Sequence, residues 1–201
     1  MMEQKPTKAR LALALKGLLN HSSMDKITVG DIAEACGIGR QSFYYHFKDK
    51  YALLEWMIRQ DLETCLNPCP DLEQWQIYTL NLLEHIRRQE RFYTRVVSGE
   101  SQLFFHQYST LLESQLLRVL VGEDQVSPAV ARRLRFAARF FSYGFAGALV
   151  QWISEGMKIP PQECIVHLHQ IGMDAGYLQS LKTACHENLT LPSHNPLGEQ
   201  V

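Results

Sequence analysis

Apolar residues recur along most of the chain with the period of an α-helix, and no stretch alternates apolar and polar residues between hairpin turns. This pattern predicts an all-α fold. The expected helices cover residues 7–21, 29–36, 40–46, 50–66, 71–89, 101–121, 128–156 and 161–185, with a further short helix near 91–97. Residues 186–201 lack the period and are expected to form a flexible tail.

Residues 28–47 have the pattern of two short helices joined by a tight turn. The first helix has one apolar face, formed by Val29, Ile32, Ala33 and Cys36. Thr28 can cap the N-terminus of this helix, and Gly37 can adopt the left-handed conformation that ends it. Phe43 and Phe47 bring the second helix back to the same core. This arrangement predicts a helix-turn-helix.

Hydrogen-bonding side chains form the outer face of the second helix. At about 100° per residue, Gln41 and Tyr45 lie opposite the two phenylalanines, with Arg40 on one flank. Arginine can bind guanine and glutamine can bind adenine, while tyrosine can pack on thymine methyl groups. Asp49 can cap a further helix that begins at Lys50, and an ammonium group beside a helix N-terminus favours phosphate. The sequence therefore predicts a DNA-reading helix followed by a phosphate contact.

The stretch "TVGDIAEACGI" followed by "SFYYHFKDK" resembles the signature of the TetR family of bacterial transcriptional regulators, and the resemblance covers residues 7–54. It implies a three-helix DNA-binding domain followed by a larger C-terminal helical bundle. It also implies that Arg40, Gln41 and Tyr44 read bases. The phosphate-contacting positions that it implies are Thr28, Ser42, Tyr45, His46 and Lys50. Gly30 departs from the family, which often has a long polar residue there, so readout is expected to depend more on the base-reading residues.

Three of these residues have plain structural alternatives. His46 can fill the seam between two domains, and Tyr45 can cover the core as a surface aromatic. Lys50 can be an ordinary solvated lysine. The DNA-binding assignment therefore depends on the whole set of residues more than on any one of them.

Length and charge support a two-domain organisation. The 201 residues, 46% of them hydrophobic, suffice for a packed core. We expect a DNA-binding domain over residues 1–54, a dimerisation and effector or partner domain over 55–185, and a tail over 186–201. Residues 1–50 have a net charge of +3, which leaves −4 for the remainder. A basic N-terminal part on a mildly acidic body is typical of a surface that faces nucleic acid.

Several classes of protein are not expected. The longest apolar run, 137–153, contains Arg139 and is shorter than the roughly 18 to 20 residues of a membrane span, and the N-terminus lacks a signal-peptide pattern. No membrane association is expected, and the predicted location is the cytoplasm. Five unpaired cysteines suit a reducing compartment. Catalytic motifs are absent, so neither enzymatic activity nor a cofactor is predicted.

Two sets of residues that include cysteine are candidate metal or redox sites. Cys65 and Cys69 are close in sequence, but Pro68 between them marks a helix end. Cys164 and His167 share a helix face, whereas His169 points away from both. No metal site is predicted, although a redox or metal role for the first pair stays open.

Small residues four apart mark two helices as surfaces for close helix packing. They are Gly144 with Ala148 and Gly172 with Gly176. The TetR resemblance places these positions in or near a homodimer interface, while packing within one chain is the alternative. An effector pocket, if the protein has one, is expected among the aromatic residues of the larger domain. The candidates are Tyr78, Phe104, Tyr108, Phe140, Tyr143 and Trp152, each of which can equally be core.

The leading hypothesis is a homodimeric regulator, a repressor of the kind common in this family, that binds a palindromic operator in double-stranded DNA and responds to a small-molecule effector. The stretch "YGFAGALVQWISEGM" is also similar to a TetR subgroup that includes regulators of dihydroxyacetone kinase operons. Such regulators are thought to act through a protein partner. The second hypothesis is therefore an activator or co-regulator controlled by a partner protein. A helical enzyme with a vestigial DNA-binding fold would need convergent titratable groups, which the sequence lacks.

Overall fold

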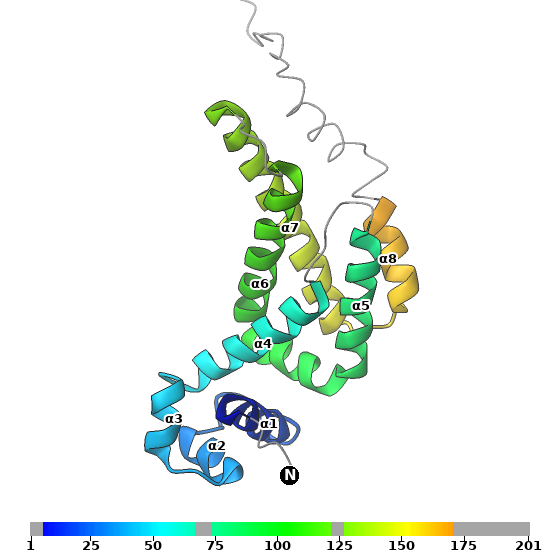
Figure 1. Cartoon of the computed structure of the whole chain (residues 1–201). Helices are drawn as coiled ribbons and strands as arrows, with labels where there is room; N and C mark the ends of the chain where they lie inside the picture. The colour runs from blue at the N-terminus through cyan, green and yellow to red at the C-terminus, as the bar shows by residue number, and fades with distance from the viewer. Residues whose placement is uncertain (1–5, 67–73, 122–126, 171–201) are drawn as a thin grey trace, which may run out of the picture.

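The computed structural model describes residues 6–66, 74–121 and 127–170, which form helices and turns without a strand (Figure 1). Three short helices, α1 (Thr7–Leu19), α2 (Val29–Cys36) and α3 (Arg40–His46), form the part that we call the head. The helix α4 (Lys50–Leu66) leads from the head to the body, which consists of α5 (Trp75–Arg88), α6 (Glu90–Val121), α7 (Pro128–Ser154) and α8 (Pro161–His169). The predicted all-α fold is confirmed.

Local capping fixes the helices of the head. The Thr28 hydroxyl accepts a hydrogen bond from the backbone N–H of Asp31 at 3.2 Å, and the Asp31 carboxylate accepts one from the backbone N–H of Thr28 at 2.7 Å. This reciprocal capping box starts α2 at the predicted residue. Gly37, with φ of 70°, ends the helix in the left-handed region. The head folds around Leu11, Leu15, Ile32, Phe43 and Phe47, all of them buried.

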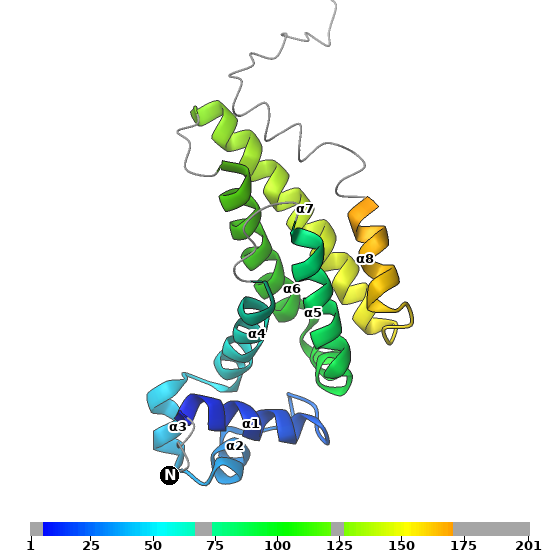
Figure 2. The same cartoon turned by 45° about the vertical axis from the view of Figure 1, so that its right-hand side comes forward.

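Two long helices dominate the body. In both views α6 and α7 run side by side in opposite directions, and α5 lies between α4 and α8 (Figures 1 and 2). The core here is apolar and aromatic and includes Phe104, Tyr108, Leu112, Leu149 and Trp152. The described part of the predicted helix 161–185 begins at Pro161, and the rest of it lies outside the described residues, as does the predicted tail.

The predicted helices 91–97 and 101–121 are joined in one helix with a bend. Glu100 has φ of −130° and ψ of 40°, which are not helical values. The bend follows Ser98 and Gly99, a pair of residues that favours kinks. Because of this bend, the first part of α6 lies over α1 while the remainder packs along α7 (Figure 2).

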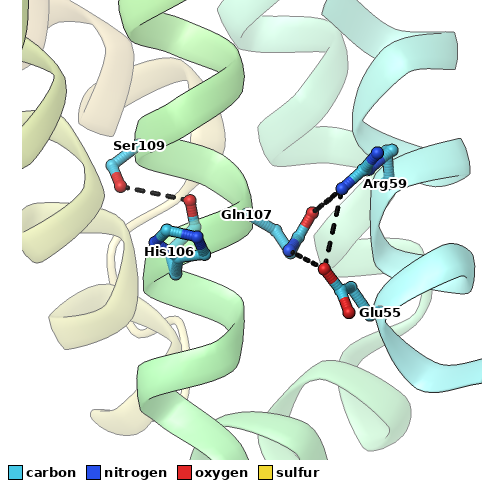
Figure 3. A network of polar contacts seen from close by, with 5 residues as sticks. All are labelled: Glu55, Arg59, His106, Gln107 and Ser109. Atoms are coloured by element: carbon cyan, nitrogen blue, oxygen red, sulfur yellow. Dashed lines mark hydrogen bonds and ion pairs between the residues drawn. The ribbon is translucent and has the colours of Figure 1, made fainter. Parts of the chain in front are cut away.

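Polar side chains bind α4 to α6. The buried amide of Gln107 donates a hydrogen bond to the Glu55 carboxylate at 2.7 Å and accepts from Arg59 at 3.2 Å (Figure 3). Two turns further along α6, the Gln115 amide donates to the backbone carbonyl of Leu66 at 3.1 Å, at the end of α4. The helix that leaves the head is therefore held to the body by directed bonds as well as by apolar packing.

Candidate DNA-binding surface

The outer face of α3 is polar and accessible. Its exposed residues are Arg40, Gln41, Ser42, Tyr44 and Tyr45. On the other side of the helix, Phe43 is fully buried. The Tyr45 side chain is 86% exposed, so it does not cover the core. His46 is half-buried, and its ring meets that of Tyr45 edge to face. The structure therefore brings the three predicted base-reading residues together on one surface.

Gly30 of α2 makes room for Arg40. The guanidinium group of Arg40 lies over the Cα of Gly30, in the space that any side chain at this position would occupy. The Arg40 charge is also one of the causes that lower the pKa of the Asp31 carboxyl, after the hydrogen bonds from the backbone and side chain of Thr28. The absence of a side chain at Gly30 thus leaves the space in which the side chain of Arg40, a predicted base-reading residue, lies.

Two predicted phosphate contacts already have partners within the head. The Thr28 hydroxyl donates to the Asp31 carboxylate at 2.8 Å. The Lys50 ammonium donates to the backbone carbonyls of Met24 at 2.6 Å, Asp25 at 3.1 Å and Ile27 at 2.7 Å. These bonds use all three donors of the ammonium group. Contact of Thr28 and Lys50 with phosphate stays a prediction, but Lys50 has a structural role that the sequence did not reveal.

Lys48 is a further cation that sequence reasoning missed. It is exposed in the turn between α3 and α4, and it has no hydrogen bond or ion pair with the described residues. In the same turn, the Asp49 carboxylate accepts from the backbone N–H of Ala52 at 2.8 Å, as predicted for a helix cap. A lysine directly after the predicted DNA-reading helix was a signal available in the sequence.

A partly buried polar cluster joins α4, α5 and α6 close to α1. The Tyr93 hydroxyl donates to the Asp61 carboxylate at 2.9 Å, and the His85 ring lies 3.3 Å from the same oxygen. Hydrogen bonds to Asp61 and Cys65 raise the pKa of His85 to about 9, so the ring is a cation at neutral pH. Burial raises the pKa of Asp61, but hydrogen bonds from His85 and Tyr93 outweigh it and the net shift is downward.

The cluster extends to the head through Gln89. The Lys16 ammonium of α1 donates to the Gln89 side-chain oxygen, and the Gln89 amide contacts the His85 ring. Lys16 also lies 4.9 Å from the ring centroid of Phe92. A continuous set of polar contacts therefore connects α1 with α4, α5 and α6.

The predicted aromatic pocket residues differ in exposure, and an effector pocket among them stays a prediction. Phe104, Tyr108 and Trp152 are core residues, and Tyr78 is half-buried. Phe140 and Tyr143 are 66% and 50% exposed on α7. The cavities that we describe lie elsewhere. One of about 440 Å³ separates α1 from α4 and is lined by apolar residues such as Ala12, Leu13, Trp56 and Met57.

The exposed face of α7 contains Gly144 and Ala148 together with large apolar residues. Phe136 is 74% exposed and lies one turn before Phe140, and a methyl group built on Gly144 would meet nothing within 4 Å. Gly172 and Gly176 lie outside the described residues. The described half of the predicted interface is thus an open apolar surface.

Within the described residues, no cluster of three or more potential metal ligands occurs. His167 lies 3.9 Å from Glu163 in an exposed pair. Burial raises the pKa of the Cys164 thiol. The side chain of His169 and all of Cys69 lie outside what the structure describes. None of the described helices is long and apolar enough to cross a membrane.

A helix-turn-helix head with an exposed polar recognition helix, joined by one helix to a helical body, defines a DNA-binding transcriptional regulator. The model of bacterial regulatory proteins of the tetR family matches residues 13–57, and that of a transcriptional regulator C-terminal region matches residues 73–174. The chain belongs to the TetR family of bacterial transcriptional regulators. Members of this family bind DNA and are not enzymes.

Two sets of relatives fit this assignment. The dhaKLM operon transcriptional activator DhaS of Lactococcus lactis subsp. lactis strain IL1403 is 28% identical over 121 residues, which cover 60% of this chain and 64% of that protein. The solved structure of the dihydroxyacetone kinase operon activator DhaS has a TM-score of 0.62 at 21% identity, with coverage of 89% of this chain and 97% of that one. A TetR regulator from Streptococcus agalactiae 2603V has a TM-score of 0.61 at 19% identity, with coverage of 82% and 92%. These structures show the shared fold.

Proposed function

We propose that the protein acts as a homodimer that binds a palindromic operator and is controlled through its body. The observation that supports DNA reading most directly is the outer face of α3. Arg40, Gln41 and Tyr44 are all accessible there and belong to a helix fixed from behind by Phe43. Each of these side chains has base partners in the major groove. We also retain the division at residues 54 and 186 as part of the proposal, and we place the protein in the cytoplasm, where its DNA lies.

Dimerisation is proposed through α7 and the helix that begins at Pro161. Its support is the exposed apolar face of α7, which includes Phe136, Phe140, Tyr143 and Gly144. Exposed apolar patches of this kind are typical of interaction sites. A dimer would also match a palindrome, because recognition helices related by a two-fold axis contact half-sites about one DNA turn apart.

Regulation has two candidate modes. In the first, the protein is a repressor released from DNA by a small molecule. In the second, it is an activator or co-regulator that responds to a partner protein. One observation favours the second mode: the relative DhaS is named as an operon activator.

The test of DNA reading is selection of bound sequences from random DNA, followed by titration of single variants on the selected site. Arg40→Ala and Gln41→Ala should each lose about 1–3 kcal/mol of binding free energy and relax preference at particular base pairs. Variants that keep both the affinity and the base preference of the wild type would exclude α3 as the reading helix. Transcription from a promoter that contains the selected site then decides between repression and activation.

A further inference from the structure

A groove lies between the last turn of α1 and the first part of α6. It encloses about 560 Å³ and is lined on the α1 side by Asn20 and His21 and on the α6 side by Arg91, Thr94 and Arg95. Glu90 is the single acidic residue of the lining. The wall of the groove is thus formed by hydrogen-bond donors from both the head and the body.

The arginines of this region fall into two pairs. Arg87 donates to the backbone carbonyl of Met157, and Arg88 lies 3.7 Å from Glu84, so both have partners within the chain. Arg91 and Arg95 lie one helical turn apart, and neither forms a hydrogen bond or an ion pair with a described residue. The guanidinium groups that face the groove are the ones that remain available.

The other lining side chains are similarly available. Within the described residues, no hydrogen bond involves the Thr94 hydroxyl, the Asn20 amide or the His21 ring. Ser98 is different, because its hydroxyl donates to the backbone carbonyl of Thr94 at 2.7 Å. Two guanidinium groups against one carboxylate give the groove a net positive charge at neutral pH. Paired arginines bind phosphate oxygens through bidentate, charge-assisted hydrogen bonds.

We propose that this groove binds a small phosphorylated molecule, held by Arg91 and Arg95 of α6 and contacted by Asn20 and His21 at the end of α1. An anion bound there would bridge the head and the body. It would therefore favour one angle between α1 and α6, and hence one spacing of the recognition helices in a dimer. The binding step is independent of the function proposed above, whereas the effect on operator affinity rests on it.

The binding step is tested without DNA, by calorimetric titration of the full-length protein with sodium pyrophosphate at constant ionic strength. The double variant Arg91→Gln/Arg95→Gln should raise the dissociation constant for pyrophosphate by about tenfold or more, because it removes two charged hydrogen-bond donors. The matched control is Arg118→Gln/Lys158→Gln, which removes the same charge from exposed positions on α6 and in the turn after α7. Its affinity should stay within about twofold of the wild type. Equal weakening of both variants, or no saturable binding below about 10 mM, would overturn the proposal.

The coupling step is tested on the selected operator. Without pyrophosphate, the groove variant should bind DNA with the same affinity and salt dependence as the control variant. Added pyrophosphate should change the operator affinity of the wild type and the control, but not that of the groove variant. A lower salt slope for the groove variant alone would instead assign Arg91 and Arg95 to DNA phosphates and would overturn the small-ligand proposal. Pyrophosphate that binds in the groove but leaves operator affinity unchanged would refute the bridge between head and body.

Discussion

The guanidinium group of Arg40 occupies the space above Gly30 where a side chain would begin. A methyl group built on Gly30 would lie 2.5 Å from Nη2 of Arg40 and 3.0 Å from its Nε. The obstructing atoms are the far end of a flexible side chain, so they can move at small cost to the fold. The position of Arg40 on the proposed DNA-binding surface therefore depends on Gly30, which has no side chain with which to reach a base.

Gly30→Ala should displace Arg40 and change base preference without destabilising the protein. Since Gly30 lies in the first turn of α2 with negative φ, alanine should even stabilise the helix by about 0.5–1 kcal/mol. Sequence selection should show altered preference at the base pair that Arg40 reads. Gly17→Ala in α1 is the control, because a methyl group there meets nothing within 4 Å. Gly17→Ala should stabilise the protein without changing its base preference. If Gly30→Ala and Gly17→Ala select the same DNA sequence, the prediction is contradicted.

Lys50→Ala should reduce stability, because it removes the donor for three backbone carbonyls of the loop that joins α1 to α2. We expect a loss of about 1–3 kcal/mol in the free energy of unfolding, measured in urea. Lys48→Ala is the comparison, since Lys48 has no such bonds within the described structure. It should leave stability unchanged and reduce the salt slope of DNA binding by about one unit. Unfolding curves for Lys50→Ala that match the wild type would refute the structural role.

The stability of the protein should fall as pH rises from about 6.5 to about 9, because the folded protein holds a proton on His85 that the unfolded chain releases earlier. Because the pKa of His85 is raised from 6.5 to about 9, its contribution to stability is fully present below pH 6.5 and is lost as the pH rises to about 9. The groups around the ring are the Asp61 carboxylate, the Cys65 thiol, the Tyr93 hydroxyl and, through Gln89, the Lys16 ammonium. His85→Gln should flatten the unfolding free energy over this range.

The control for this measurement is His106→Gln, which changes an exposed histidine on α6. It should retain the decline in stability between pH 6.5 and 9. A decline that persists in His85→Gln and disappears in His106→Gln would reverse the assignment. At low pH, the depressed pKa of Asp61 predicts a separate loss of stability below about pH 4, as its carboxylate becomes protonated.

Phe140→Glu should weaken the proposed dimer, because it puts a charge into the exposed apolar face of α7. Sedimentation equilibrium should show a larger fraction of monomer at a given concentration. Leu13→Glu is the matched control, since Leu13 is also exposed, at 53%, but lies on α1. Dimers of equal strength in both variants would place the interface away from this face.

The sequence predicted the helices of the head well because their signals are local. Thr28, Gly37 and Asp49 act on backbone groups within a few residues of themselves, and α2, α3 and α4 begin and end at the predicted residues. The less accurate bounds lie where packing decides. The predicted helix 7–21 ends at Leu19, the last residue of α1 that is buried in the core.

Contacts between residues far apart in the chain could not be predicted from the sequence. The partners of Lys50 lie 23 to 26 residues away, and nothing in the local pattern distinguishes a lysine bound to carbonyls from one free to meet phosphate. The aromatic residues posed the same problem. Phe104 and Phe140 are both phenylalanines in helices, but Phe104 is fully buried and Phe140 is 66% exposed. Their difference arises from the direction in which each helix faces its neighbours.

The bonds at the two ends of α4 set the size of the movement that the head can make. Lys50, the first residue of the helix, is tied to the head, and Leu66, the last, is tied to α6 by Gln115. Its 17 residues form a rod of about 25 Å. A tilt of only about 5° around the Leu66 end would shift the Lys50 end by about 2 Å. In a two-fold dimer the two shifts add, so the recognition helices would separate by up to about 4 Å, a large mismatch against a DNA turn of about 34 Å.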